Sequence, residues 1–295
     1  MYSQIDSNRR KSWILIAVFV GLLAAVGWVY GYIVSDTGPF GLVLAVGISF
    51  VMTLVSWFGG DKIALATSGA KELTERAQFP TLWNIVENLA ITAGIPKPRI
   101  YIIEDDSPNA FATGRDPQHS SIAVTTGLLA RLEKVELEGV LAHELSHVKN
   151  YDSRVMMLVI VLVGAIALIG DYFIRFSDDD EKPGPLAVVG ILFIILSPVI
   201  ANLIKLAVSR KREYLADASG ALLTRYPEGL ASALEKISSA GMPLQKNSSA
   251  INHLWVAEPD GSKRGIKSRI QGLFSTHPPI DDRIAKLRQM VDNKV

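Results

Sequence analysis

Four long apolar runs limit what this chain of 295 residues can become. They cover residues 13–34, 40–58, 155–170 and 186–208. The first and the fourth are long enough, at about 1.5 Å per residue, to cross an apolar layer of roughly 30 Å as helices, and the second is only slightly shorter. The third is marginal in length, and burial in a protein core is the alternative for it. We therefore expect about four transmembrane helices, paired in two hairpins.

Charged residues predict how these spans are oriented. The segments at 9–11, before the first run, and at 210–212, after the fourth, are basic. The linker at 35–39 carries no Lys or Arg, and the segment at 178–181 is acidic. Because Lys and Arg are enriched in the cytoplasmic loops of membrane proteins, we expect a multi-pass protein of the cytoplasmic (inner) cell membrane. Its larger polar segments, and any site that they form, should face the cytoplasm.

The first run has one further interpretation, a cleavable signal peptide. Its apolar stretch exceeds the roughly 7 to 15 residues usual for such a segment, and no small-residue cleavage site follows it. Composition excludes other classes. A net charge of +1 gives no case for a nucleic-acid partner, and the absence of cysteine excludes thiolate metal ligands and disulfides.

The polar segments show mainly helical patterns and one short extended region. Amphipathic helical patterns cover residues 73–94, ending at Gly94, and residues 132–150. Between them, residues 99–105 and 119–129 contain runs rich in β-branched side chains, which predict two strands. Residues 209–295 are mostly helical in pattern. The expected fold is therefore mainly α with a small β-sheet.

The second helical pattern contains a metal-binding arrangement, His143-Glu144-Leu145-Ser146-His147. On a helix the two histidines differ by about 40° in azimuth, so both imidazoles aim at one point, while Glu144 is offset by about 100°. Two neutral imidazoles bind Zn²⁺, and the glutamate beside them can take a proton from a metal-bound water. The alternative is a solvated helix face that only resembles such a site.

Catalytic zinc needs a third protein ligand, and "SRKREYLADASG" offers Glu213. Asp217 follows four residues later on the same helical face, where it can accept a hydrogen bond from a ligand imidazole. Such carboxylate pairs are also common on solvated helices. Glu213 follows His147 by 66 positions (213 − 147), and the third and fourth apolar runs lie between them. A membrane hairpin would return Glu213 to the side on which His147 lies.

Four stretches of the chain together resemble the HtpX-type membrane zinc metallopeptidases, bacterial relatives of the CAAX prenyl endopeptidases. They are "SPNAFATG" at 107–114, "HELSHVKNYD" at 143–152, "SRKREYLADASGA" at 209–221 and "STHPPIDDRIAKL" at 275–287. The resemblance covers nearly the whole chain. It implies one zinc ion per chain, bound by His143, His147 and Glu213, with Glu144 as the catalytic base, in a gluzincin-like fold beside the membrane.

The resemblance also implies stress-linked quality control of membrane proteins. We expect a zinc endopeptidase that hydrolyses misfolded or damaged membrane proteins at the cytoplasmic face, with the lipid bilayer and membrane-protein or peptide substrates as partners and no nucleic acid. The alternatives are a membrane chaperone or adaptor with structural zinc, and a CAAX-type prenyl-protein endopeptidase. The oligomeric state stays open. The expected parts are a transmembrane hairpin at 1–58, a peptidase part at 59–154, a second hairpin at 155–208 and a second peptidase part at 209–295.

Other residues in these stretches have two interpretations each. Asn109 and Ala110 either border the cleft and bind substrate backbone or form a turn after the first strand. His277 and Arg283 either stabilise the oxyanion or cap the helix that "HPPIDDRI" predicts. A further hypothesis places an extended substrate on an edge strand formed by residues 120–126.

Overall fold

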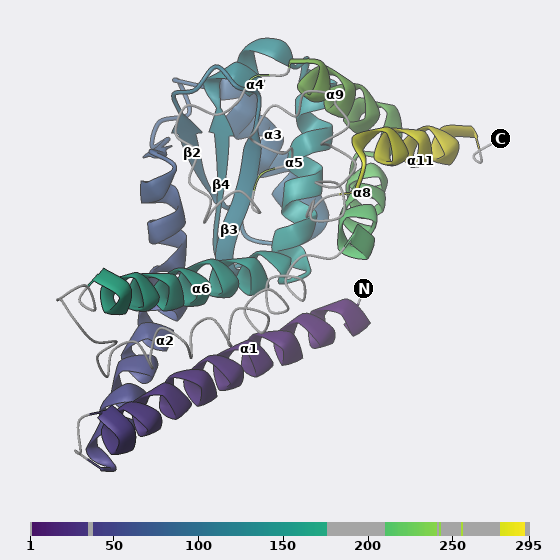
Figure 1. Ribbon diagram of the computed structural model, residues 1–295. Helices are drawn as coiled ribbons and strands as arrows, with labels where there is room; N and C mark the ends of the chain where they lie inside the picture. The colour runs from purple at the N-terminus through teal and green to yellow at the C-terminus, as the bar shows by residue number, and fades with distance from the viewer. Residues whose placement is uncertain are drawn as a thin grey trace. The chain divides into compact units, whose positions relative to one another are not determined.

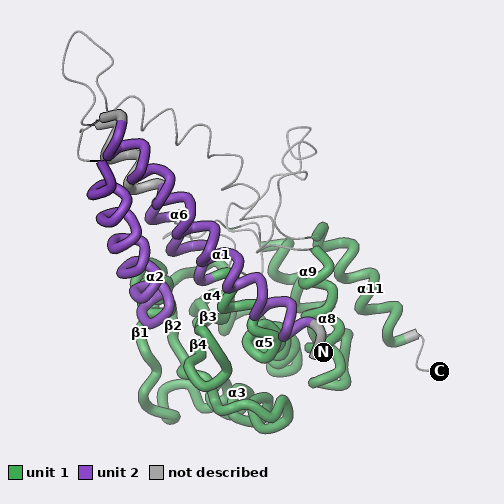
Figure 2. Tube along the Cα trace, turned by 90° about the horizontal axis from the view of Figure 1, so that it is seen from below, with its two compact units in different colours: residues 1, 61–156, 208–295 green, residues 2–60, 157–207 purple. Residues whose placement is uncertain are grey.

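The computed structural model describes residues 2–34, 38–175, 210–240, 242, 255 and 278–292. The chain divides into two compact units, drawn in different colours in Figure 2. Unit 1 contains residues 1, 61–156 and 208–295, and unit 2 contains residues 2–60 and 157–207. The fourth apolar run, His277 and nearly all of the segment 245–268 lie outside the described residues.

The described part of unit 2 is built from the first three apolar runs. Two helices of the described chain are long and apolar enough to cross a membrane, at Gln4–Tyr32 and Phe40–Thr67, and they contain the first two runs. The third run lies in helix α6, which is not among those candidates. Its side chains at 158, 162 and 166 form a buried cluster with Phe19 and Leu23. The helix bounds are α1 Tyr2–Val29, the π-helical η1 Tyr30–Val34, α2 Phe40–Thr67 and α6 Asp152–Arg175.

Glycines allow helices α1 and α2 to approach each other closely. A Cβ on Gly27 would lie 2.5 Å from the carbonyl oxygen of Gly41 and 2.3 Å from the Cβ of Ala45. No side chain fits at that separation, so glycine is required at position 27. Small residues of this kind commonly mark contacts between membrane helices, and here they fix the contact within the first hairpin.

Unit 1 contains a four-stranded mixed sheet in the order β1-β2-β4-β3. Strand β4 pairs in parallel with β2 and antiparallel with β3, and β1 pairs antiparallel with β2. Strand β3 therefore forms one edge of the sheet and β4 lies in its interior. The strand bounds are β1 Lys71–Glu72, β2 Arg99–Ile103, β3 Ala110–Asp116 and β4 His119–Thr125.

Three details of the sheet differ from the sequence-based prediction. Residues 110–116, for which no strand was predicted, form strand β3, whose Ala and Gly residues carry little strand signal and which is held by its pairing with β4. The hypothesis of an edge strand at 120–126 is wrong, because β4 has neighbours on both sides. The helical pattern at 73–94 gives a helix only from Pro80: the Leu73 backbone N–H donates to Ile100 of β2, and proline suits the first helical turn.

The helices of unit 1 pack around α5, as Figure 1 shows: the sheet edge β3 lies on one side of it and α8 and α9 on the other. Helix α3 ends at Gly94, which has a left-handed φ of 69°, as the sequence predicts. Helix α5 begins at a capping box formed by Glu133 and Glu136. The bounds are α3 Pro80–Ala93, α4 Thr126–Arg131, α5 Lys134–Lys149, α8 Arg210–Thr224, α9 Pro227–Ala240 and α11 Ile280–Asp292.

Candidate metal centre

Helix α5 carries the first two candidate metal ligands one turn apart. The Nε2 atoms of His143 and His147 lie 3.2 Å from each other, so both imidazoles converge on one point, as the spacing predicts. Both rings come from a helix whose other faces are covered by the sheet and by α8 and α9. The packing of α5 therefore fixes where the two rings point.

Helix α8 supplies the third candidate ligand. The Oε2 atom of Glu213 lies 3.7 Å from Nε2 of His143, and its Oε1 atom lies 3.6 Å from Nε2 of His147. Gly220, two turns along α8, makes this approach possible. A Cβ there would lie 2.9 Å from the backbone nitrogen of His143, so only glycine lets the two helix backbones come this close.

The spacing of these donor atoms fits one small divalent cation. The three ligand atoms all lie within 4.8 Å of one another. Zinc bonds of about 2.0–2.2 Å at tetrahedral angles separate neighbouring ligand atoms by about 3.3–3.5 Å, which is close to the distances between the imidazole nitrogens and the carboxylate oxygens. Two imidazoles and one carboxylate are also a donor set typical of zinc, whereas magnesium and calcium prefer oxygen ligands alone.

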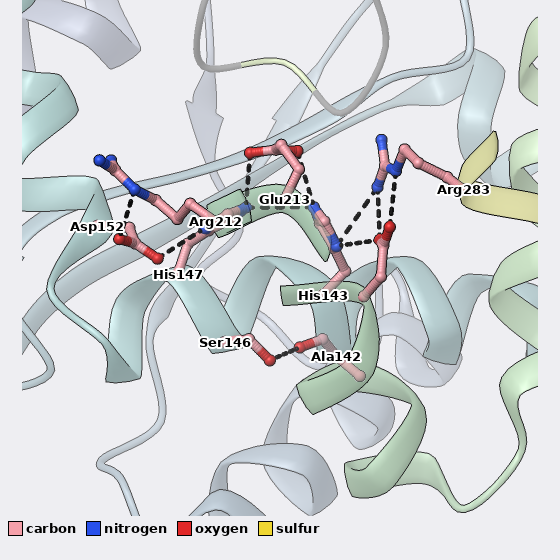
Figure 3. A network of polar contacts seen from close by, with 9 residues as sticks. Ala142, His143, Ser146, His147, Asp152, Arg212, Glu213 and Arg283 are labelled. Atoms are coloured by element: carbon pink, nitrogen blue, oxygen red, sulfur yellow. Dashed lines mark hydrogen bonds and ion pairs between the residues drawn. The ribbon is translucent and has the colours of Figure 1, made fainter. Parts of the chain in front are cut away.

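A buried carboxylate orients the first histidine. The Nδ1 atom of His143 lies 2.9 Å from Oδ1 of Asp217, and the Arg283 guanidinium donates to the same carboxylate at 2.7 and 2.9 Å (Figure 3). This contact was expected from the i, i+4 spacing of Glu213 and Asp217. Arg283 therefore lies behind the imidazole, at its Nδ1 side, and not beside the metal-binding Nε2. The Asp217 carboxylate accepts from Nδ1–H and so leaves Nε2 free to bind a metal.

Burial acts to lower the pKa of each imidazole, and the neighbouring carboxylates act to raise it. Burial lowers the pKa of His143 and so favours the neutral ring that a metal requires. Burial also acts to lower the pKa of His147, but the hydrogen bond to Asp152 and the charge of Glu213 outweigh it and raise that pKa to about 9. A metal ion competes with this proton for the ring, so metal binding at this site releases protons.

Glu144 follows His143 on the same helix and is almost fully buried at 2% exposure. Burial raises its pKa to about 8, against the opposing charge of His147. Its carboxylate accepts a hydrogen bond from the backbone of Ala112 on the edge strand β3. A carboxylate with a raised pKa beside two metal-binding imidazoles is suited to take up and return a proton near neutral pH.

The other residues singled out in the sequence have the following positions. Asn109 is buried, and its side-chain oxygen accepts a hydrogen bond from the Ala110 backbone at 3.1 Å at the start of β3. Helix α11 begins with two early aspartates, as "HPPIDDRI" predicts.

Sequence analysis missed two residues that contact this centre. Asp152 lies 3.2 Å from Nδ1 of His147, and Arg212 lies 3.0 Å from the same carboxylate (Figure 3). Both residues fall inside the stretches quoted for the family resemblance. No helical spacing rule connects Asp152 to His147, because a turn interrupts the helix between them.

Comparisons with known proteins place this centre in a family. The family model described as "Peptidase family M48" matches residues 76–291. A "Protease HtpX homolog" of Dictyoglomus thermophilum is 46% identical over 98% of this chain and 94% of its own length. The homologue of the same description from Tropheryma whipplei is 45% identical over 98% of both chains. The crystal structure of S. mikatae Ste24p aligns with a TM-score of 0.54 at 20% identity, covering 97% of this chain and 67% of that one, which shows a shared fold.

Proposed function

Because the chain belongs to peptidase family M48 and is a membrane metalloprotease, we propose that it is a zinc endopeptidase which cleaves misfolded or damaged membrane proteins at the cytoplasmic face of the cell membrane. The observation that carries this proposal is the convergence of His143, His147 and Glu213 from two helices. The ligand spacing and the donor set support zinc, at one ion per chain.

Zinc held by His143, His147 and Glu213 would act as a Lewis acid, polarising the scissile carbonyl and lowering the pKa of a water molecule. Glu144 accepts the proton of the attacking water and returns it to the leaving amine. Because Glu144 is buried, bulk water has little access to the proton on its carboxyl group. Asp217 holds the His143 ring in the tautomer that presents Nε2, and Arg283 keeps Asp217 ionised.

The substrate is proposed to bind in extended form along strand β3, the sheet edge beside α5. Peptide groups of an edge strand point alternately toward and away from the sheet. The Asn109 carbonyl accepts from Thr125, so the N–H groups and carbonyls of Ala110 and Ala112 point away from β4. The two N–H groups already donate to the Asn109 side chain and to the Glu144 carboxylate, so a substrate would pair with the two carbonyls. Backbone pairing at these groups would recognise a peptide without reading its sequence, which suits a protease of varied damaged proteins.

Three features support action at the membrane. The described residues contain two candidate membrane helices. Residues 9–11, before the first apolar run, and 210–212, after the fourth, are basic, which favours a cytoplasmic location for both segments. His147 precedes the third apolar run by eight positions (155 − 147). A catalytic centre encoded so near an apolar run is suited to segments of membrane proteins that emerge from the bilayer.

The likeness to Ste24p does not favour prenyl-protein cleavage here, because at 20% identity it shows the fold alone. A chaperone or adaptor with structural zinc differs from the proposal in one respect: Glu144 would then be dispensable. The test is therefore Glu144→Gln in the full-length protein in detergent, with a misfolded membrane protein, its folded form and a prenylated peptide as alternative substrates.

We expect the parent protein to cleave the misfolded substrate, and the Glu144→Gln variant to keep its zinc and lose cleavage by at least about 10³-fold. The reason is that the neighbouring carboxylates of Asp152 and Asp217 are each held by an arginine and cannot take over the proton transfer. Cleavage of the prenylated peptide alone would favour the prenyl-protein alternative. Undiminished cleavage by the variant would rule out this mechanism.

A further inference from the structure

Each histidine of the proposed metal centre is bonded, through its Nδ1 atom, to an aspartate that is paired in turn with an arginine. The first of these chains is His143, Asp217 and Arg283, described above. The second is His147, Asp152 and Arg212, with distances of 3.2 Å from the imidazole to Oδ2 and 3.0 Å from the guanidinium Nε to Oδ1 (Figure 3). The repeated order of residue types indicates that Asp152 does for His147 what Asp217 does for His143.

The pair of Asp152 and Arg212 is buried, with side-chain exposures of 2% and 3%. Removing two opposite charges from water costs free energy, and a buried pair of this kind persists only where geometry and hydrogen bonds compensate it. The two carboxylate oxygens of Asp152 are directed to different partners, Oδ2 to the imidazole and Oδ1 to the guanidinium. Arg212 therefore fixes the rotamer in which Asp152 meets His147.

The backbone between the two helices is arranged to produce this contact. Helix α5 ends at Lys149 and helix α6 begins at Asp152, only three positions later. Tyr151 between them has a φ of 61°, a left-handed conformation that is unfavourable for a residue with a side chain. Such strain persists where the surrounding structure determines it, and it is typical of functional sites. The turn brings Asp152 back to the face of α5 that carries His147.

A simpler interpretation of Asp152 is that it only caps helix α6, in whose first turn it lies. Capping alone explains an acidic residue at this position, but it gives no reason for the arginine beside it or for the contact with the imidazole. The two interpretations separate on one substitution. Asparagine caps helices about as well as aspartate, but it carries no charge for Arg212 and is a weaker acceptor for the imidazole N–H.

We propose that Asp152 is a positioning residue for the second histidine of the metal centre, and that its ion pair with Arg212 joins the two halves of that centre. This inference rests on the proposed metal ligands. The Asp152 carboxylate accepts from Nδ1–H of His147 and thereby directs the Nε2 lone pair toward the metal. Arg212 immediately precedes the ligand Glu213, so the same carboxylate also fixes the start of helix α8.

The position of the pair in the chain gives it a further consequence. The chain leaves unit 1 after residue 156 and re-enters it at residue 208. Asp152 lies four positions before the exit (156 − 152), and Arg212 lies four positions after the re-entry (212 − 208). Within unit 1, the ion pair joins the end of the first segment to the start of the second. The separation of His147 from Glu213 is thereby held by a contact between their neighbours within unit 1.

The test uses the full-length protein in detergent and two readouts that do not depend on turnover. Zinc affinity is measured by competition with a chromophoric chelator, and the visible absorption of the Co²⁺-substituted protein reports the ligand geometry. Asp152→Asn is expected to weaken zinc binding by about 10- to 100-fold and to change the Co²⁺ spectrum. With zinc saturating, kcat should fall while KM stays within about twofold, because substrate contacts are untouched.

Glu136→Gln is the matched control, since Glu136 is a buried carboxylate at the other end of helix α5 that pairs with Lys236 at 2.8 Å. This variant is expected to lower thermal stability and to leave zinc affinity and the Co²⁺ spectrum unchanged. Arg212→Lys, which keeps the charge but removes the guanidinium that lies 3.0 Å from Asp152, is expected to weaken zinc binding several-fold when Asp152 is present. Added to the Asp152→Asn variant, the same substitution should weaken zinc binding no further, because the two residues act through one contact.

An Asp152→Asn variant that binds zinc as tightly as the parent, with the same Co²⁺ spectrum, would overturn the proposal. If that variant fails to fold, unchanged zinc affinity in Arg212→Lys would overturn it instead. Failure of the proposed function would have another signature: His143→Ala would then bind zinc like the parent. If zinc binding is lost in His143→Ala but unchanged in both Asp152→Asn and Arg212→Lys, the proposed metal centre is supported and only the role of the ion pair is contradicted.

Discussion

At the scale of single residues, the catalytic centre combines groups that function requires but stability does not favour. Glu144 is the clearest case, because burial raises the pKa of its carboxyl to about 8. A group whose pKa is raised by folding stabilises the folded state at low pH, and that stabilisation is lost as the pH rises from the unfolded value of 4.5 to about 8. Ionised Glu144 is therefore a cost that the folded protein carries at alkaline pH.

Glu144→Gln should consequently raise the thermal stability of the protein at pH 8 when metal is removed with a chelator. The gain is at most about 5 kcal/mol, from a pKa change of about 3.5 units at 1.36 kcal/mol each, and part of it is offset by the lost attraction to His147. Thermal unfolding of both proteins at pH 5 and pH 8 measures this. The variant should gain several degrees at pH 8 and little at pH 5; an equal gain at both values would contradict the assigned pKa.

Arg283 is predicted to be a stability residue as well as a support for the metal centre. It is fully buried, and its removal leaves the Asp217 carboxylate without its counter-charge. Breaking a buried pair on one side costs about 3–5 kcal/mol, so Arg283→Met should lower the melting temperature by roughly 10 °C. Arg288→Gln is the control on the same helix, because its pairs with Glu228 and Glu235 are exposed and should contribute little.

The same ion pair predicts a dependence on pH. Burial acts to raise the pKa of Asp217, but the charge of Arg283 and the hydrogen bond to His143 outweigh it and lower that pKa to about 2. The stabilisation by Asp217 is therefore present above its unfolded pKa of 3.8 and is lost as the pH falls toward 2. Unfolding temperatures measured between pH 5 and pH 2 should fall steeply in the parent and less steeply in Arg283→Met. Parallel curves would contradict the pairing.

At the scale of elements, the edge strand β3 determines how a substrate can bind. A peptide that binds along β3 donates its N–H groups to the outward carbonyls of Ala110 and Ala112. N-methylation of the corresponding alternate peptide bonds in a model substrate should raise KM by about fivefold per hydrogen bond lost, which corresponds to about 1 kcal/mol. Methylation at the intervening bonds, which face away from β3, should leave KM unchanged and serves as the control. Equal effects at every position would contradict pairing along β3.

Local patterns predicted those elements whose residues carry a strong signal of their own. Gly94 ends helix α3 with a left-handed φ, and the helical pattern at 132–150 gives α5 almost to its bounds. Strand β3 escaped prediction because Ala110, Ala112 and Gly114 have little strand preference, and only the register with β4 makes them a strand. The helical pattern failed at its start, where the Leu73 backbone N–H donates to Ile100 of β2 and the helix begins only at Pro80.

The candidate centre was predictable to the extent that it follows helical spacing. His143 with His147, and Glu213 with Asp217, are each four residues apart on one helix. The contact between Asp152 and His147 depends on the strained turn at Tyr151, and the pairing of Asp152 with Arg212 joins parts of the chain 60 positions apart (212 − 152). Neither relation leaves a periodic signal in the sequence.

At the scale of the whole molecule, the proposed orientation can be tested because the natural chain has no cysteine. Single cysteines are introduced at Ser35, in the linker between the first two apolar runs, and at Lys71, whose side chain is exposed in unit 1. A membrane-impermeant maleimide applied to intact cells should label Ser35→Cys, and should label Lys71→Cys only after the cells are opened. The reverse pattern would place the metal centre outside the cytoplasm.

The central claim is that two distant halves of the chain, around His147 and Glu213, build one catalytic zinc centre. Zinc content and proteolysis of the same purified preparations test it most directly, using the parent, Glu213→Gln and Glu144→Gln. The account predicts one zinc per chain with cleavage in the parent, loss of both in Glu213→Gln, and zinc without cleavage in Glu144→Gln. Full zinc occupancy and undiminished cleavage in Glu213→Gln would contradict it.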